Sequence, residues 1–239
     1  MKAELKQVKA MVFDVFGTVV DWRGSVAREI SKLARARRMD IDAAAFADAW
    51  RARYHPSMDR VRKGDLPWTV LDVLHRASLD ELLLEFGVNG LAEADIDHLN
   101  RVWHRLKPWP DSVSGLKRLK RRYLLSTLSN GNFALLANMG KFAKLPWDCI
   151  LSAELFRHYK PDPEVYLGAA ALLGVQPHEL MMVAAHKNDL AAAKKCGLAT
   201  AFVHRPLEHG PARKPDLAPA PYLDITARDF NALAAKLNL

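Results

Sequence analysis

The first residue whose surroundings point to chemistry is Asp14, which follows the apolar run at residues 8–13. That run has the β-branched and aromatic content of a short strand buried on both faces. Gly17 and Thr18 follow, and the glycine allows a turn tight enough to bring backbone N–H groups near the Asp14 oxygens. Open α/β sheets place their chemistry at such strand ends. Asp14 is therefore either a reactive carboxylate or a turn cap, since Asp and Gly are ordinary turn residues.

Three further polar groups stand where other segments end. Ser129 and Asn130 follow one apolar segment, Lys160 lies within Tyr-Lys-Pro-Asp, and Asp189 lies within His-Lys-Asn-Asp. The carboxyl ends of parallel strands meet at one edge of a sheet, so we expect these groups to lie near Asp14. A lysine beside a carboxylate favours its ionised form, and an ionised, well-aimed carboxylate can act as a nucleophile.

The elements that must position these groups alternate along the second half of the chain. Strands are expected at residues 123–128, 149–152, 180–184 and 200–203, with a last short one at Tyr222. Helices are expected at residues 112–121, 133–140, 163–173, 189–196 and 227–237. Repeated β–α units of this kind indicate an α/β fold with a doubly wound parallel sheet.

The region after Thr18 predicts helices alone. Residues 26–53, 65–86 and 92–106 carry apolar side chains at helical spacing, and Pro108 ends the region. We therefore expect an α/β core domain made of residues 1–19 and 109–239. A helical domain of residues 20–108 is expected to be inserted after the first strand.

The ordered set of motifs around Asp14, Ser129, Lys160 and Asp189 resembles the haloacid dehalogenase superfamily over almost the whole core. Within that superfamily the chain is most similar to the L-2-haloacid dehalogenases. The resemblance implies a Rossmann-like core, a helical cap that closes over the active site, and a homodimer. It also implies hydrolysis of short 2-haloalkanoic acids to 2-hydroxy acids. In that reaction Asp14 displaces the halide with inversion, and water then cleaves the resulting ester.

Two positions differ from the metal-dependent phosphatases of that superfamily. Those enzymes carry a second aspartate where this chain has Phe16, and an acidic residue where it has Ala185. Magnesium prefers octahedral oxygen ligands with carboxylate support, and Asp14 with Asp189 makes a poor site for it. A phosphate group would then face Asp14 with little charge neutralisation. We expect no metal and no other cofactor, and a small-molecule phosphatase is the alternative activity.

The resemblance also implies roles for individual side chains. Lys160 would keep Asp14 ionised, and Asp189 would hold Lys160 in place. The hydroxyls of Thr18 and Ser129 would donate to the oxygens of Asp14 and of the substrate. Contacts with substrate or halide are expected from Arg51, Asn130, Phe16, Tyr166, Trp50 and Asn188. An apolar wall that excludes water is expected from Trp50, Trp68 and Tyr54.

Alternatives remain open for several of these residues. Arg51 is either the cap arginine that holds the halide or the substrate carboxylate, or a surface arginine like its neighbours Arg53 and Arg60. Tyr166 either lies near Lys160 or packs in the core. The aromatic residues of the region 20–108 form either the pocket wall or the interior of the cap.

The last motif departs from the pattern Ser-x-Asn-x-x-Asp, because Ala184 and His186 stand at the matched places. His186 is either a base that orients the hydrolytic water, a role that suits imidazole near neutral pH, or a hydrogen-bond partner of a carboxylate. Where some relatives place an aromatic residue against the halide, this chain has Asn188. A smaller and more polar pocket points to fluoride as a leaving group and to fluoroacetate as a substrate.

Composition sets the broad class. The chain has 239 residues, half of them hydrophobic, which is enough for a substantial core. A net charge of +8 favours anionic partners. The basic run at residues 117–122 is either a solvated helix face or a nucleic-acid stripe, and it lacks the aromatic residues that interleave with charge in many such stripes. A non-catalytic binder of anions or nucleic acid is the second alternative function.

The apolar runs and the cysteines of the chain indicate its location and its partners. No apolar run approaches the roughly 18 residues that span a bilayer, and no signal-peptide pattern is present. Cys149 and Cys196 are isolated from each other in the sequence and are expected to be buried thiols. We therefore expect a cytoplasmic protein. Its expected partners are a small 2-halocarboxylate and water, with no nucleic acid and no membrane.

Overall fold

The computed structural model describes residues 3–214 and 216–239. Its centre is a six-stranded sheet in the order β5 (Cys149–Ser152), β4 (Leu124–Ser129), β1 (Ala10–Phe13), β6 (Leu180–Ala184), β7 (Ala199–Val203) and β8 (Ile225–Ala227). All neighbouring strands in this sheet are parallel. The predicted doubly wound α/β sheet is confirmed. Its strand order reverses direction between β1 and β6, and ligands of such sheets bind at this point.

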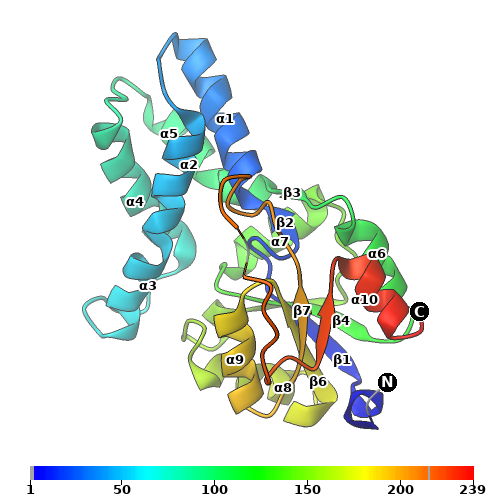
Figure 1. Cartoon of the computed structure of the whole chain (residues 1–239). Helices are drawn as coiled ribbons and strands as arrows, with labels where there is room; N and C mark the ends of the chain where they lie inside the picture. The colour runs from blue at the N-terminus through cyan, green and yellow to red at the C-terminus, as the bar shows by residue number, and fades with distance from the viewer. Residues whose placement is uncertain (1–2, 215) are drawn as a thin grey trace.

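Helices cover both faces of the sheet (Figure 1). Side chains alternate along β1, so that Ala10 and Val12 enter one apolar cluster while Met11 and Phe13 enter the other. The first face is covered by α8 (Pro163–Leu172) and α9 (Lys187–Lys195). The second is covered by α6 (Ser112–Leu119), α7 (Phe133–Phe142) and α10 (Phe230–Lys236). Burial on both faces explains why β1 and β6 are continuously apolar.

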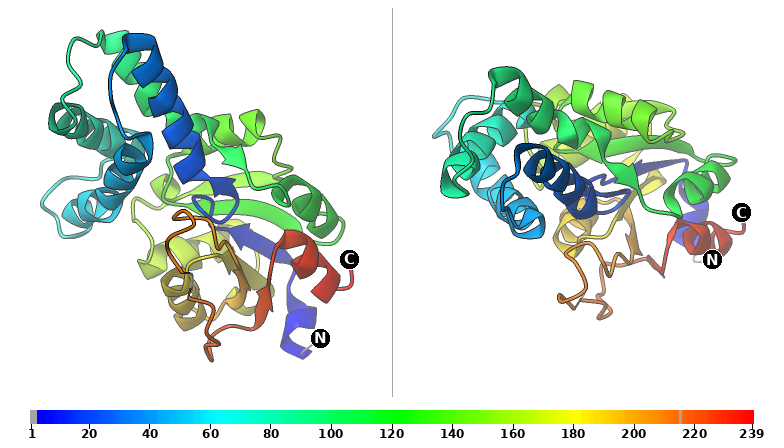
Figure 2. Two further views of the ribbon diagram at one scale, coloured as in Figure 1. Left: turned by 45° about the horizontal axis from the view of Figure 1, so that its top comes forward. Right: turned by 90° about the horizontal axis from the view of Figure 1, so that it is seen from above.

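The helices of the first half of the chain form a separate group, apart from the helices that cover the two faces of the sheet (Figures 1 and 2). This group lies across the cavity from the carboxyl edge of the sheet. Its helices are α1 (Trp22–Arg37), α2 (Ala43–Ala52), α3 (Tyr54–Arg62), α4 (Leu71–Glu85) and α5 (Glu93–Asn100). A short antiparallel ribbon of β2 (Val20–Asp21) and β3 (Lys107–Pro108) joins this helical group to the sheet. Short 3-10 segments lie at η1 (Ala3–Gln7), η2 (Arg101–Arg105), η3 (Ala153–Leu155) and η4 (Pro177–Glu179).

The structure confirms the predicted strands at residues 149–152 and 180–184 to the residue, and it corrects the last strand. That strand was expected at Tyr222 and begins at Ile225, which pairs with Ala201. Tyr222 directly follows Pro221, which ends the Pro-rich segment 205–221. Because proline lacks the N–H that a sheet ladder needs, pairing starts only beyond this segment.

The helical half differs from the prediction in its breaks. Residues 26–53 form two helices, because Arg38 takes a left-handed conformation with φ 54° and ends α1. Helix α3 was not predicted, and its Pro56 lies in the first turn, where a missing N–H costs little. Helix α4 begins at Leu71 instead of residue 65, since Pro67 disfavours helical geometry in the residue before it. The ribbon of β2 and β3 was also not predicted.

Two further expectations concern the burial of the cysteines and the exposure of the basic run on α6. Cys149 and Cys196 are free thiols but only half-buried, so the prediction of fully buried cysteines is corrected. Both lie at the ends of elements, where neighbouring layers cover them incompletely. On α6, Leu116 and Leu119 are fully buried, and the basic residues beside Leu116 and beyond Leu119 are half-buried or exposed. This agrees with a solvated helix face.

Candidate functional site

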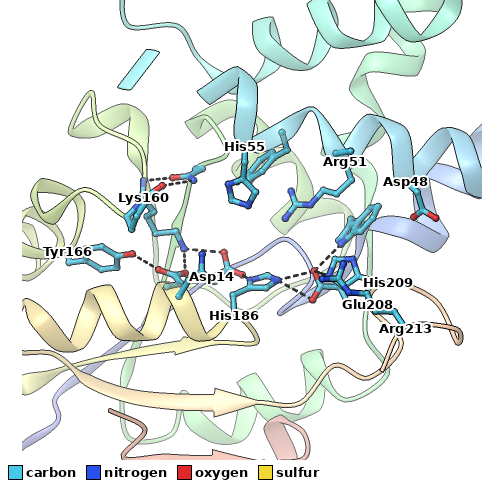
Figure 3. A pocket seen from close by; sticks show the side chains of 17 residues that line it. Asp14, Asp48, Arg51, His55, Lys160, Tyr166, His186, Glu208, His209 and Arg213 are labelled. Atoms are coloured by element: carbon cyan, nitrogen blue, oxygen red, sulfur yellow. Dashed lines mark hydrogen bonds and ion pairs between the residues drawn. The ribbon is translucent and has the colours of Figure 1, made fainter. Parts of the chain in front are cut away.

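The polar groups identified at the strand ends meet at the carboxyl edge of the sheet (Figure 3). Asp14 directly follows β1, and Phe13 pairs with Val183 of β6 and with Thr127 of β4. Asp189 lies in the first turn of α9, which follows β6. The parallel register of three adjacent strands therefore brings together residues up to 175 positions apart, as the sequence motifs predicted.

Three donors surround the carboxylate of Asp14. Thr18 Oγ1 donates to Oδ2 at 2.6 Å, Lys160 Nζ donates to Oδ1 at 3.1 Å, and His186 Nδ1 lies 3.0 Å from Oδ2. Burial by itself raises the pKa of Asp14, but the nearby Lys160 ammonium and His186 outweigh it and hold this pKa far below its usual value. Asp14 is thus an ionised carboxylate within a cavity.

Lys160 lies between two carboxylates, since its ammonium group also bonds Asp189. Tyr166 donates its hydroxyl to the other Asp189 oxygen at 2.5 Å. Burial lowers the pKa of Lys160, and the charges of Asp14 and Asp189 reverse that effect and raise it. The lysine is therefore a fixed cation. Both alternatives for Tyr166 hold, each for a different part of the side chain. Its hydroxyl lies near Lys160, and its ring packs in the core.

His186 connects Asp14 to an acid that the sequence did not identify. Its Nε2 lies 2.9 and 3.1 Å from the two oxygens of Glu208, and Trp22 Nε1 donates to the same carboxylate at 3.1 Å. Burial disfavours the charged imidazole, but Glu208 and Asp14 together raise the pKa of His186 to about 10. Glu208 lies five residues after the end of β7. Residues that follow a parallel strand lie near the carboxyl edge of the sheet, so the position of Glu208 after β7 is a signal for this site in the sequence.

Asn130 and Ser129 differ in their positions relative to the cavity. Asn130 holds the Lys160 backbone: its Oδ1 accepts from Lys160 N at 2.7 Å and its Nδ2 donates to Lys160 O at 3.4 Å. Asn130 also lines the cavity. Ser129 is fully buried and accepts from Gly131 N at 3.2 Å. The expected Ser129 donation to Asp14 is corrected, because no such bond exists among the described residues.

Arg51 of α2 points into the cavity from the helical side (Figure 3). Its guanidinium carbon lies 3.9 Å from the ring centre of Tyr54 and 5.4 Å from that of Trp22. The buried Nη1 atom has no hydrogen-bond partner within residues 3–214 and 216–239. Arg51 is therefore not a surface arginine; it lines the cavity. An aromatic cradle and a free donor are suited to an anion.

The cavity has a volume of about 550 Å³ and is bounded by both the sheet edge and the helical group. The helical side contributes Trp22, Asp48, Arg51, Ala52, Tyr54 and His55. The core side contributes Asp14, Asn130, Lys160, Pro161, Tyr166, His186, Asn188, Asp189, Glu208, His209 and Arg213. Acidic and basic side chains therefore line the core side of the cavity, and Arg51, whose buried Nη1 has no hydrogen-bond partner among the described residues, lines the helical side.

Three aromatic residues that were expected at the pocket lie elsewhere. Trp50 is buried inside the helical group, where Nε1 donates to His75 O at 3.1 Å. Phe16 is buried against Trp103, with ring centres 5.8 Å apart. Trp68 packs on Tyr159 with ring centres 4.8 Å apart. The prediction that these side chains line the cavity is corrected, because each completes an apolar layer. Tyr54 does line it, and Trp22, which was not predicted, takes the place of Trp50.

The carboxylates of this site do not fit a magnesium ion. Asp14 and Asp189 both bond the Lys160 ammonium, so a cation already occupies the space between them. The described ranges contain no group of three or more His, Cys, Asp or Glu side chains placed to hold a metal ion. Phe16 and Ala185 supply no oxygen ligand from their side chains.

Comparisons with known proteins give the family of the chain. A family profile described as haloacid dehalogenase-like hydrolase matches residues 8–197. The (S)-2-haloacid dehalogenase 4A of Burkholderia cepacia is 32% identical over 204 residues, which cover 83% of this chain and 84% of that protein.

Two solved structures are similar over nearly the full chain. The defluorinating L-2-haloacid dehalogenase Rha0230 is 49% identical with a TM-score of 0.94, and the match covers 97% of this chain and 96% of that one. The L-2-haloacid dehalogenase PA0810 is 48% identical with a TM-score of 0.93, covering 97% and 99%. Within the described part of the chain, no helix is long and apolar enough to cross a membrane.

Proposed function

Because the chain belongs to the haloacid dehalogenase-like hydrolase family, we propose that it hydrolyses short 2-haloalkanoic acids to 2-hydroxy acids without a metal. The observation that carries this proposal is the ionised Asp14 with its lysine and histidine partners, facing a cavity that Arg51 also lines, with a buried Nη1 that has no partner among the described residues. The high identity to two L-2-haloacid dehalogenases over nearly the full chain supports the same reaction.

In the first step an Asp14 oxygen attacks C2 of the substrate. Oδ2 already accepts from Thr18 and His186, whereas among the described residues Oδ1 accepts only from Lys160. Oδ1 therefore keeps a lone pair for the attack. The Oδ1–C2 bond forms as the carbon–halogen bond breaks with inversion, and the halide leaves with the bonding electrons. Arg51 and Asn130 are the donors that solvate its growing charge.

In the second step water attacks the carbonyl carbon of the Asp14 ester. One water proton passes to Asp189, whose pKa is raised mainly by burial and which is the remaining carboxylate of the pair once Asp14 is esterified. The bond between Oδ1 and the carbonyl carbon then breaks, and the hydroxy acid takes the proton from Asp189. The second water proton leaves the new carboxyl group to solvent, and Asp14 returns to a carboxylate. The attacking water leaves its oxygen on Asp14.

We include fluoroacetate among the substrates. Asn188 and His55 line the cavity with polar groups, and fluoride needs strong hydrogen-bond donors as it leaves. The similar protein Rha0230 is described as defluorinating.

The helical region 20–108 is proposed to act as a cap on a core of residues 1–19 and 109–239. Support comes from the cavity, because Arg51 and Tyr54 of that region face Asp14 and Lys160 across it. The ribbon of β2 and β3 marks both crossings between the two regions.

A cytoplasmic location and a homodimer also belong to this proposal. The two free cysteines agree with a reducing compartment. Phe133 and Phe142 of α7 are about half exposed, at 47% and 49%, which agrees with a face that a second copy covers. Sedimentation velocity tests the dimer directly, and a monomer at micromolar concentration would contradict it.

The decisive test is a single turnover of 2-chloropropionate in heavy-oxygen water, followed by mass analysis of the peptide that carries Asp14. We expect heavy oxygen in the Asp14 side chain, stoichiometric chloride release, and no effect of a chelator. Asp14→Asn removes the nucleophile and is expected to abolish chloride release. Label found only in the hydroxy acid would contradict the ester, and chelator-sensitive release of phosphate from phosphoesters would favour the phosphatase.

A further inference from the structure

The surroundings of His186 indicate its protonation state, because both ring nitrogens face ionised carboxylates. Nδ1 faces an oxygen of Asp14 at 3.0 Å, and Nε2 faces both oxygens of Glu208 at 2.9 and 3.1 Å. Two carboxylates accept hydrogen bonds and donate none. Both ring nitrogens must therefore carry a hydrogen, and the side chain is an imidazolium with no lone pair available for a proton.

The two oxygens of Asp14 have different partners. Oδ2 accepts from the Thr18 hydroxyl and from His186, and Oδ1 accepts from Lys160. The backbone N–H of Ala185 donates to Thr18 Oγ1 at 2.9 Å, which directs the hydroxyl hydrogen toward Asp14. Once Oδ1 has become the ester oxygen, Oδ2 is the carbonyl oxygen. It is then already flanked by two donors.

We propose that Glu208 holds His186 protonated, so that His186 and Thr18 form an oxyanion hole for Oδ2 when water attacks the Asp14 ester. This inference rests on the proposed function and assigns a positioning residue to its second step. It differs from a role for His186 as the base, because an imidazolium bonded to two acids donates and does not accept.

The step balances with groups already present. Water oxygen bonds to the carbonyl carbon, the carbonyl π electrons move to Oδ2, and one water proton passes to Asp189. When the tetrahedral intermediate collapses, the electrons on Oδ2 restore the double bond and the bond to the hydroxy-acid oxygen breaks. That oxygen leaves with the bonding electrons and takes the proton from Asp189, and the second water proton leaves the new carboxyl group to solvent. Donors aimed at the oxygen on which charge develops lower the barrier because they need no reorganisation.

The side chain of Glu208 is held in position by burial, by a hydrogen bond and by the space above a glycine. The residue is 4% exposed, and Trp22 donates to its Oε1. Gly17 leaves space for it, since a side-chain carbon at that position would lie 2.1 Å from Oε1. The glycine of the nucleophile turn therefore admits the acid that holds His186.

The charged groups around His186 come from every element packed on it. Asp14 follows β1, and Glu208 and His209 lie in the loop after β7. Arg51 and His55 approach from α2 and α3. Burial by itself raises the pKa of Glu208, but the nearby His186 outweighs this effect and lowers that pKa below its ordinary value. The pair is therefore an ion pair throughout the neutral range.

The test compares Glu208→Gln with Asp216→Asn, a control in the same loop whose acid pairs with Lys187 at the surface. Rapid-quench halide release and intact mass after mixing with 2-chloropropionate separate the two steps. We expect Glu208→Gln to keep the halide burst within about tenfold, to slow ester hydrolysis at least tenfold, and to accumulate the alkylated protein. His186→Gln removes the cation itself and is expected to stall hydrolysis about a hundredfold. Asp216→Asn is expected to behave as the unchanged protein.

The pH profile of ester hydrolysis gives a readout that a structural role would not move. In the unchanged protein Glu208 raises the pKa of His186 also when Asp14 is esterified, so the rate is expected to hold well above the ordinary histidine pKa. In Glu208→Gln this alkaline limb is expected to move down toward the ordinary histidine value of about 6.5.

Ester hydrolysis in Glu208→Gln that equals or exceeds that of the unchanged protein at pH 8 would overturn the inference. So would an equal loss of both steps, or an alkaline limb that stays in place. Failure of the unchanged protein to release halide or to form the adduct would overturn the proposed function instead, and the inference with it.

Discussion

At the residue scale, the cations of the site differ in how completely they are paired. Lys160 bonds two aspartates, and His186 bonds Asp14 and Glu208. Arg51 contacts aromatic rings and leaves Nη1 without a partner among the described residues. Arg51 therefore offers an incoming anion a buried donor that no described residue occupies. This is the physical basis for giving it the halide or the substrate carboxylate.

The first prediction at this scale is Arg51→Met, with Arg53→Met as its matched control. Losing a hydrogen bond to a charged group costs about 1.5–3 kcal/mol, so kcat/KM for halide release should fall roughly tenfold to a hundredfold. Arg53 pairs with Glu81 and Glu85 on the outer side of the helical group. Its loss should leave halide release unchanged, and equal effects of the two substitutions would remove Arg51 from the site.

At the element scale, the turn after β1 is as important as the strand itself. Gly17 has φ 83°, a conformation that side chains rarely adopt, and Glu208 packs directly against it. Gly17 N also donates to Val20 O at 3.0 Å, which closes the turn. The turn thereby places Thr18 beside Asp14 and leaves room for Glu208.

The prediction at this scale compares Gly17→Ala with Gly64→Ala. Both glycines have φ 83°, but a side chain at Gly64 meets nothing within 4 Å. Both substitutions should lower the free energy of unfolding by about 1–2 kcal/mol through backbone strain. Only Gly17→Ala should also slow ester hydrolysis, because it displaces Glu208. Urea unfolding and single-turnover kinetics measure the two effects, and full activity of Gly17→Ala would refute the packing argument.

At the scale of the whole molecule, polar pairs join the helical group to the sheet and its flanking elements. Asp72 of α4 accepts from Asn132 Nδ2 at 2.9 Å and lies 3.0 Å from His104 Nε2. Arg62 donates to Asp162 at 2.7 Å. Inside the helical group, His75 stacks on Trp103 with ring centres 4.3 Å apart, and neither of its ring nitrogens has a partner among the residues described.

The stability of the molecule should therefore depend on pH through His75. Burial lowers the pKa of His75 from 6.5 to about 3. A histidine that stays neutral when folded contributes stability above its unfolded pKa, and that stability is lost as pH falls from about 6.5 toward 3.

His75→Phe should flatten this acid limb. Between pH 7 and pH 4.5 the unchanged protein should lose on the order of 2 kcal/mol more than the variant. The comparison uses urea unfolding at both pH values, and the difference between the two slopes cancels the shared contribution of the carboxylates. Parallel slopes would show that His75 is not held neutral.

The sequence by itself determined which residues end the central strands and in what order the strands follow. Asp14, Lys160 and Asp189 could be predicted because apolar runs define buried strands, and parallel strands end at one edge. The helix breaks at Arg38 and Pro67 were less accessible, since they depend on single residues within longer periodic patterns.

Only the tertiary structure decided which side chains face the cavity. Trp22 and Glu208 face it, while Trp50 and Phe16 do not, although all four lie in plausible segments. Spacing shows which residues share an element, but the way the helical group and the β7 loop pack on the sheet selects the face that remains open. Contacts such as that between Trp22 and Glu208, 186 residues apart, follow from that packing and from no local pattern.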